Sequence, residues 1–369
     1  MRRKLGIISV ILLAAVLLSG CTGAIAWPGL AATEEVAYLA NTTAVYGVDL
    51  NGGKLLWSFS GEGGGFLNTN RSLLITTPVA TENGLVIVMD SSSKHVIYAL
   101  DPNDLDEDDV PDIEWSFSDA KGLWIAAPLI LGNRLYAPNS DGNVYVLDLQ
   151  DGQPEKVISV SQEQDGEDRL WGQPVTDGER LFITSLDKSV IGIDLETYEF
   201  WHVDVGGAVP GGAVLGGDGM LYVGSLAKQL ERFDPLTGDH ESVLETNGWI
   251  WGTPVANGDN LYFGDVNGYF YSYNVKEAKL NFDPIKPDAS ITASPLVLGE
   301  RVLIATESGN IYAVDADGKS TLWYEVEKGK AYTTPVLAGG HVLVAYIESD
   351  YYLVALDEEG HSAWTFAGK

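Results

Sequence analysis

The chain has 369 residues, and its 52 acidic side chains outnumber its 22 Lys and Arg, so its formal charge is −30. Such a surface repels the phosphate backbone of nucleic acids, whose binding requires Lys and Arg, and we exclude nucleic acid as a partner. Cys21 is the only cysteine, so no disulfide within the chain can stabilise the fold.

Residues 1–20 have the layout of a secretory signal peptide. Residues 2–4 are basic, residues 5–18 are almost wholly apolar, and the small residues Ser19 and Gly20 follow. An apolar run of about 14 residues is too short to cross a bilayer as a helix, which needs roughly 20. We therefore expect export and removal of this segment.

Cys21 ends the sequence Leu-Leu-Ser-Gly-Cys, which resembles the lipobox of bacterial lipoproteins. In that family the thiol receives a diacylglyceryl group and becomes the first mature residue. The alternative is an ordinary signal peptide with a chance cysteine. Thr22, rather than Asp, resembles a signal for the outer membrane where the cell has one. We expect a lipid anchor at Cys21 on the outer face of a bacterial membrane, followed by a tether at residues 21–27.

Residues 28–369 repeat a unit of about 40 residues, as in repeat architectures. Each unit starts with an anchor position, 39 to 50 residues from the next. The anchors are Pro28, Pro78, Pro128, Pro174, Ala213, Pro254, Pro295 and Pro335. Every unit contains four short alternating segments separated by Gly, Asn or Asp, which predict strands joined by hairpins. The sequence therefore predicts an all-β fold, an eight-bladed β-propeller with four antiparallel strands in each blade.

Two further marks recur in each unit. About 20 residues after the anchor, an apolar strand ends in Asp or, once, Asn. We interpret this residue as a turn former that accepts backbone N–H groups, rather than as part of a ring of ligands. A large apolar residue follows seven or eight positions later, and we expect it to pack between blades. These residues are Trp57, Trp201, Phe282, Trp323 and Trp364, with Trp115 after an insertion.

Aromatic residues precede several anchors by three or four positions, where the chain passes from one blade to the next. They are Trp124, Trp171, Trp251 and Tyr332. Aromatic side chains are enriched at the energetic centres of interfaces, which makes this set a candidate partner-binding rim. The alternative is that they plug the channel or pack on the neighbouring blade.

One insertion carries alternate carboxylates, at Asp104, Asp106, Asp108 and Asp112. Calcium needs six to eight oxygen ligands, and a loop of alternate carboxylates can wrap around it. The pattern lacks the usual turn glycine, because Asp109 stands there, and it lacks a Glu at the twelfth position. A calcium site and a solvated acidic loop both remain open.

The repeated pattern Pro-Val-x-x-x-Gly-x-Leu-Tyr, then Gly-x-x-Tyr-x-Leu-Asp, then Leu-Trp resembles the pyrroloquinoline-quinone-type propeller repeat. Together with a lipobox, this repeat resembles the BamB family of outer-membrane assembly lipoproteins, which implies a scaffold of the machinery that inserts β-barrels. Other proteins with the same repeat are quinoprotein dehydrogenases.

The sequence argues against a quinone enzyme. Quinoprotein alcohol dehydrogenases with this repeat carry adjacent cysteines beneath the quinone, whereas Cys21 lies outside the repeats. The five histidines are scattered without metal-ligand spacing. We expect a monomeric, non-catalytic scaffold that binds a membrane or envelope protein. A cell-surface module for protein or glycan is the second hypothesis, and a redox enzyme the third.

Overall fold

The computed structural model describes residues 27–61, 72–161 and 169–368. The signal peptide and Cys21, which we expect to carry the lipid, lie outside the described residues. Within these three ranges no helix is long and apolar enough to cross a membrane.

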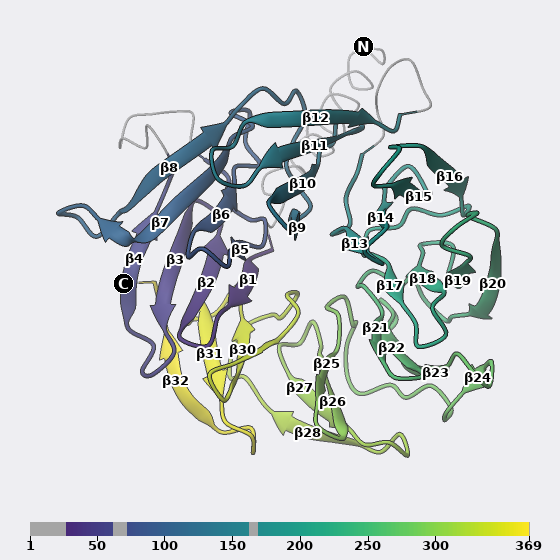
Figure 1. The fold of residues 1–369 in the computed structure, drawn as a ribbon. Helices are drawn as coiled ribbons and strands as arrows, with labels where there is room; N and C mark the ends of the chain where they lie inside the picture. Colours follow the sequence, from purple (N-terminus) through teal and green to yellow (C-terminus); the bar gives the residue numbers. More distant parts are fainter. Residues whose placement is uncertain (1–26, 62–71, 162–168, 369) are drawn as a thin grey trace, which may run out of the picture.

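The described chain forms eight four-stranded antiparallel sheets arranged as blades around a central axis (Figure 1). Each blade uses four consecutive strands, and the first strands of blades 5, 6, 7, 8, 1 and 2 contact one another in that order around the centre. The eight-bladed β-propeller predicted from the repeat is therefore confirmed.

Blades 1 to 4 contain β1 (Gly29–Ala32), β2 (Val36–Asn41), β3 (Ala44–Asp49) and β4 (Leu55–Phe59); β5 (Val79–Ala80), β6 (Val86–Met89), β7 (Ile97–Leu105) and β8 (Pro111–Phe117); β9 (Leu129–Leu131), β10 (Arg134–Pro138), β11 (Asn143–Asp148) and β12 (Pro154–Ser159); β13 (Val175–Thr176), β14 (Arg180–Thr184), β15 (Ser189–Asp194) and β16 (Phe200–Asp204). Blades 5 to 8 contain β17 (Val214–Leu215), β18 (Leu221–Gly224), β19 (Gln229–Phe233) and β20 (His240–Glu245); β21 (Val255–Asn257), β22 (Asn260–Gly264), β23 (Phe270–Asn274) and β24 (Lys279–Leu280); β25 (Leu296–Leu298), β26 (Arg301–Ala305), β27 (Ile311–Val314) and β28 (Ser320–Tyr324); β29 (Val336–Ala338), β30 (His341–Ala345), β31 (Leu353–Leu356) and β32 (Ser362–Phe366).

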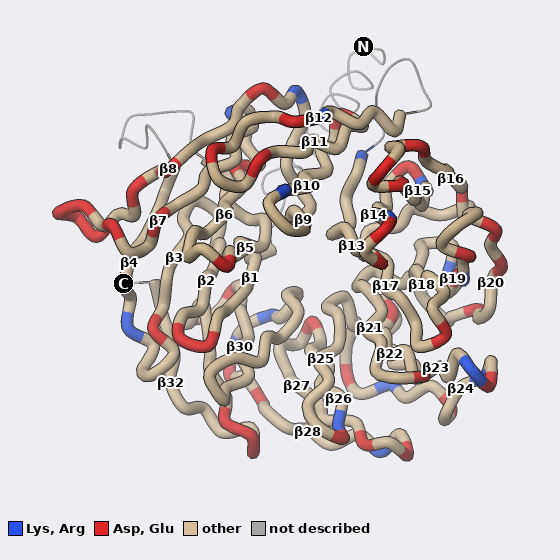
Figure 2. The backbone as a smooth tube through the Cα atoms, viewed as in Figure 1, with Lys and Arg blue, Asp and Glu red and all other residues tan. Residues whose placement is uncertain are grey.

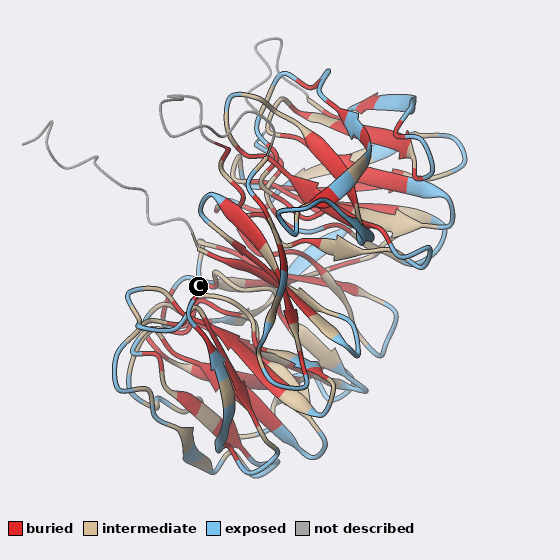
Figure 3. Ribbon diagram, turned by 90° about the vertical axis from the view of Figure 1, so that its left-hand side faces the viewer, coloured by how far each residue is buried: buried red, intermediate tan, exposed pale blue. Residues whose placement is uncertain are grey.

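The anchor residues stand immediately before the first strand of each blade, as Pro78 does before β5. Proline has no N–H to donate, and the start of an edge strand is a place where that loss is tolerated. The second and third strands of a blade are covered on both faces by the neighbouring blades. All four residues of β6, a second strand, are therefore buried. Outer strands such as β12 are largely exposed, and first strands such as β9 are half-buried. Figure 3 shows buried residues inside the blades and exposed ones along their edges.

Alternating strand direction gives the ring two different faces. The connection face carries the segments that lead from one blade to the next anchor. The turn face carries the turn between the third and fourth strand of each blade, with its recurring Asp. At Asp194 the carboxylate accepts the N–H groups of Glu196 at 3.0 Å and Thr197 at 2.8 Å, which is the turn predicted for this residue type.

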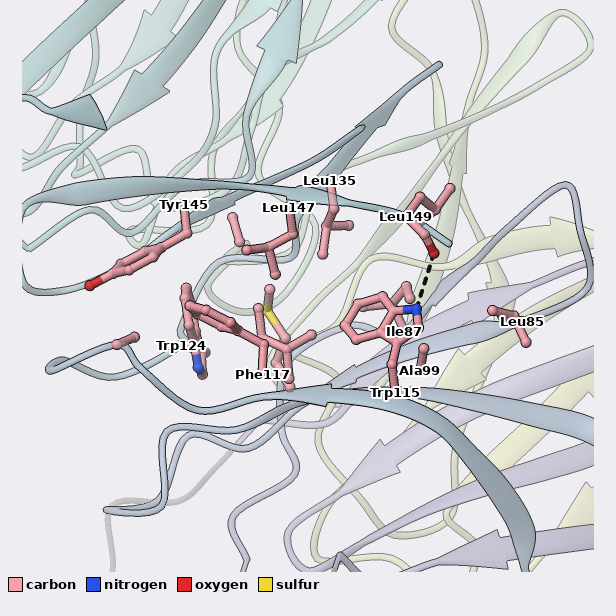
Figure 4. Close-up of a cluster of buried hydrophobic side chains, with 14 residues drawn as sticks. Leu85, Ile87, Ala99, Trp115, Phe117, Trp124, Leu135, Tyr145, Leu147 and Leu149 are labelled. Atoms are coloured by element: carbon pink, nitrogen blue, oxygen red, sulfur yellow. Dashed lines mark hydrogen bonds between the residues drawn. The ribbon is translucent and has the colours of Figure 1, made fainter. Parts of the chain in front are cut away.

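Tryptophans on the outermost strands of three blades donate hydrogen bonds to the next blade. The indole N–H of Trp115 in blade 2 donates to the carbonyl of Leu149 in blade 3 at 3.0 Å (Figure 4). The ring lies directly over Gly152 of the same turn, where any Cβ would collide with it. Equivalent bonds connect Trp201 to Pro235 at 3.1 Å and Trp364 to Leu50 at 2.8 Å. The predicted packing of these aromatics between blades is thus observed.

The ring closes between blade 8 and blade 1 without a shared strand. Buried residues of both blades form one hydrophobic cluster there, which includes Leu39 and Leu353. The Trp364 indole spans the same boundary, and on the connection face the Thr333 hydroxyl donates to the carbonyl of Pro28 at 2.7 Å. Closure therefore rests on side chains and loops alone.

Candidate functional site at the channel mouth

Each connection holds one side chain that is buried against the preceding blade. This residue stands four positions before the anchor and is at most 1% exposed. The residues are Leu74, Trp124, Leu170, Val209, Ile250, Ile291 and Ala331. Glycine on the preceding blade makes room at two of them, since a Cβ on Gly224 would collide with Ile250 and one on Gly264 with Ile291. The residue three positions before the anchor is thereby directed toward the mouth of the channel.

Trp124 occupies this buried position and is therefore a core residue rather than part of the partner-binding rim. It is 0% exposed, its indole N–H donates to the carbonyl of His95 at 2.8 Å, and its ring meets Tyr145 edge-on at 5.4 Å (Figure 4). The physical reason is register. Trp124 precedes its anchor, Pro128, by four residues, whereas the other three predicted aromatics precede theirs by three.

Trp171, Trp251 and Tyr332 are half-buried at the connection face. Two of them are brought together by Trp27, a residue that the sequence analysis did not select. The ring of Trp27 stacks on Tyr332 with centroids 4.8 Å apart and planes at 7°, and it meets Trp251 at 5.4 Å and 61°. Trp171 lies on a separate connection, between blades 3 and 4. We call Trp27, Trp251 and Tyr332 the aromatic cluster.

The sequence does contain a signal for Trp27, because it is the last residue before the first anchor, Pro28. Tyr332 precedes the eighth blade and Trp251 the sixth, so these two residues approach each other only across the inside of the ring. Trp27 bridges them, which places the start of the propeller at the channel mouth.

A buried carboxylate fixes the connection that carries Trp251. Asp265 is 0% exposed and accepts the N–H of Gly248 at 2.7 Å and the hydroxyl of Tyr271 at 2.8 Å. The carbonyl of Trp249 accepts the N–H of Val266 at 3.0 Å. These hydrogen bonds fix the backbone of the connection. The Trp249 side chain, two residues before Trp251, is 49% exposed.

Charged residues surround the Tyr332 side of the cluster. Burial raises the pKa of the Tyr332 phenol, and the nearby Glu307 carboxylate raises it further, so the hydroxyl stays protonated near neutral pH. Lys330 forms an ion pair with Glu348 at 3.1 Å. The cluster therefore offers neutral aromatic surface next to a pair of opposite charges.

The predicted calcium ligands do not converge. Asp104 and Asp112 lie on the paired strands β7 and β8, and all four candidates are exposed at the tip of this hairpin, where Figure 2 shows a dense acidic group. The carboxylate of Asp106 accepts the N–H groups of Asp108 and Val110, both at 2.9 Å, and so stabilises its own turn. Among the described residues, the group of three that places its ligand atoms within 4.8 Å is instead Asp357, Glu359 and His361.

Comparison with known proteins agrees with this architecture. A family profile described as Outer membrane protein assembly factor BamB matches residues 22–240 and 281–369. The chain belongs to the BamB family. A search of the curated proteins finds no match.

Solved structures repeat the BamB-type fold at low sequence identity. BamB from Moraxella catarrhalis is 16% identical, with a TM-score of 0.67 over 86% of this chain and 92% of that one. The computationally designed Ika8 protein is 13% identical, with a TM-score of 0.66 over 93% of this chain and 98% of that one. At such identities the likeness concerns the fold alone.

The BamB family profile leaves residues 241–280 unmatched. This stretch holds the whole of blade 6 and the connection with Trp249 and Trp251. One arm of the aromatic cluster therefore lies outside the residues that the family profile matches.

Proposed function

We propose that the chain is a lipid-anchored, extracytoplasmic scaffold that binds an envelope protein through its connection face and takes part in outer-membrane protein assembly. Membership of the BamB family supports a protein-binding role. We propose no catalytic role, and a monomeric ring as the working form.

The position of Trp27 carries this proposal. Six peptide units separate Trp27 from Cys21, and they reach at most about 21 Å at ~3.5 Å per residue. Because Trp27 is packed at the channel mouth, a lipid on Cys21 would hold the connection face toward the membrane. A membrane-embedded or membrane-adjacent protein is the partner that this face would meet.

The chemistry of that face fits protein binding. Half-buried aromatic rings supply large apolar contact area at low entropic cost, and Trp is enriched among residues that dominate binding energy. Trp249 and the cluster together place three tryptophans and a tyrosine at one mouth of the ring. The formal charge becomes −33 when the three basic residues of the signal peptide are subtracted, which makes anionic lipid itself a poor partner.

Attachment is tested with Cys21→Ala. We expect the variant to fold normally but to move from the membrane fraction to the soluble fraction, because the acyl chains attach the protein to the membrane. Thr22→Ala, which keeps the thiol, should remain in the membrane fraction. Wild-type protein that takes up no radiolabelled palmitate would contradict the anchor.

The orientation is tested by photocrosslinking in intact membranes. A benzophenone amino acid at Trp249, which is 49% exposed on the connection face, should capture a membrane protein. The same group at Leu236, which is 64% exposed on the turn face, should not. Capture of a membrane protein from Leu236 alone would show that the opposite face meets the partner.

A further inference from the structure

A pocket of about 310 Å³ opens on the turn face between blades 6 and 7. Blade 6 contributes the start of β22, alternate residues of β23 and the segment after β24. Blade 7 contributes the start of β26 and the end of β27. Six of the twelve lining residues are polar or acidic: Asn260, Ser272, Asn274, Asn281, Glu300 and Asp315. Phe270, Val302, Val314 and Ala316 are apolar. Tyr262 and Phe282 add aromatic rings.

Blade 6 lacks the indole bond that joins blades 2, 4 and 8 to the next blade. Phe282 stands at the corresponding position, and its ring covers a turn glycine, Gly318, whose added Cβ would lie 2.6 Å from the ring. A phenyl ring has no N–H to donate. Ala316, which corresponds to Leu50 and Leu149, lines the pocket, and its carbonyl receives no indole N–H from Phe282.

An amide network orients the polar wall. The side-chain oxygen of Asn260 accepts N–H groups from Asn274 at 3.1 Å and Asn281 at 2.9 Å, and Asn281 also donates to the hydroxyl of Ser272 at 2.8 Å. These bonds use the oxygen of Asn260 and the amide nitrogen of Asn281. The amide N–H groups of Asn260 and the oxygen of Asn281 are left to serve a ligand as donor and acceptor.

We propose that this pocket binds one unit of a neutral saccharide. Amide donors and acceptors in the same wall suit hydroxyl groups, which both donate and accept, and the rings of Tyr262 and Phe282 offer apolar surface to the C–H groups of a pyranose ring. The lining includes two carboxylates, Glu300 and Asp315, and no Lys or Arg, which disfavours an anionic ligand. The volume lies at the lower end of the range for ligand pockets, roughly 300–1,000 Å³, as a single sugar unit requires.

The pocket is separate from the channel mouth. Asn260, Ser272 and Asn274 lie within residues 241–280, which the BamB family profile does not match. The pocket opens on the turn face, opposite the aromatic cluster. Loss of either site would leave the other intact, so this inference does not depend on the proposed scaffold function.

The test uses ligand-observed NMR with the full propeller and four probes: methyl α-D-glucopyranoside, N-acetyl-D-glucosamine, D-glucuronate and D-glucosamine. We expect at least one of the two neutral sugars to bind with a millimolar dissociation constant. D-Glucuronate should bind about tenfold more weakly because its carboxylate meets Glu300 and Asp315. Asn281→Ala, at an exposed position, should weaken the neutral sugar by about fivefold to tenfold.

Phe282→Trp provides the decisive variant. An indole there should fill the pocket, donate to the Ala316 carbonyl as at three other boundaries, abolish sugar binding and raise Tm. Asn133→Ala is the matched control, since Asn133 donates to Asp148 at 2.7 Å on the turn face of blade 3 and its loss should leave binding unchanged. The inference is overturned if neither neutral sugar binds, if only D-glucosamine binds, or if both Phe282→Trp and Asn281→Ala bind sugar as the wild type does.

Discussion

Trp364→Ala is expected to lower the free energy of unfolding by about 3 kcal/mol, near the lower limit for truncating a core tryptophan because the side chain is only half-buried. The loss has two parts. The ring no longer covers Gly53, whose added Cβ would lie 2.5 Å from it, and the carbonyl of Leu50 loses its donor. Trp364→Phe should remove only the second part, about 1 kcal/mol. Chemical denaturation measures both variants.

The region that opens in Trp364→Ala should distinguish the boundary between blades 8 and 1 from the other boundaries. Blades 8 and 1 are not connected by chain, so weakening their contact should permit local opening of these two blades. Hydrogen exchange in β1–β4 and β29–β32 should therefore accelerate more than elsewhere. Trp115→Ala removes the equivalent bond between blades 2 and 3, which remain connected by the chain, and serves as the matched control. Uniform acceleration around the ring in Trp364→Ala would refute the closure role.

Trp251→Ala is expected to weaken capture of the membrane partner by more than tenfold, because truncation of an aromatic interface anchor costs about 2 kcal/mol or more. The free energy of unfolding should change by less than about 1 kcal/mol, since Trp251 is half-buried and its ring meets that of Trp27 edge-on. Quantitative co-purification from solubilised membranes and thermal unfolding measure the two effects independently.

Trp124→Ala supplies the contrast for Trp251→Ala. Its side chain is fully buried, so we expect a loss of about 3–5 kcal/mol in the free energy of unfolding. Partner capture by the fraction that remains folded should be unchanged. If Trp251→Ala instead destabilises the fold to the same degree and captures the partner normally, the aromatic cluster is structural and the interface lies elsewhere.

The fold was accessible from sequence because one pattern occurs eight times. Each anchor stands directly before a first strand, and the recurring Asp forms the same kind of turn from Asp49 to Asp357. The secondary structure of a single short segment is ambiguous, but the same pattern in eight units removes that ambiguity. A feature shared by all units is therefore predictable even when each example is weak.

The site was less accessible because it depends on differences between units. Trp124 and Trp171 look alike in sequence, yet a shift of one residue relative to the anchor places the first in the core and leaves the second half-buried. Trp27 lies outside the repeated pattern, and its partners come from two distant connections. Phe282 was grouped with the tryptophans as a large apolar residue, although it lines the pocket and has no N–H to donate to the next blade.

The starting point of the chain within the ring is topologically arbitrary. Every sheet is built from consecutive strands, and the boundary between blades 8 and 1 carries the same indole bond as those between blades 2 and 3 and between blades 4 and 5. Phe366 ends β32 on the connection face, where β1 begins. A short linker could join the end of β32 to the start of β1, and new termini could be placed at the exposed Gly206 between blades 4 and 5. Such a circular permutant would keep all eight sheets intact. The lipid anchor proposed at Cys21 could then be attached to a different blade in each permutant.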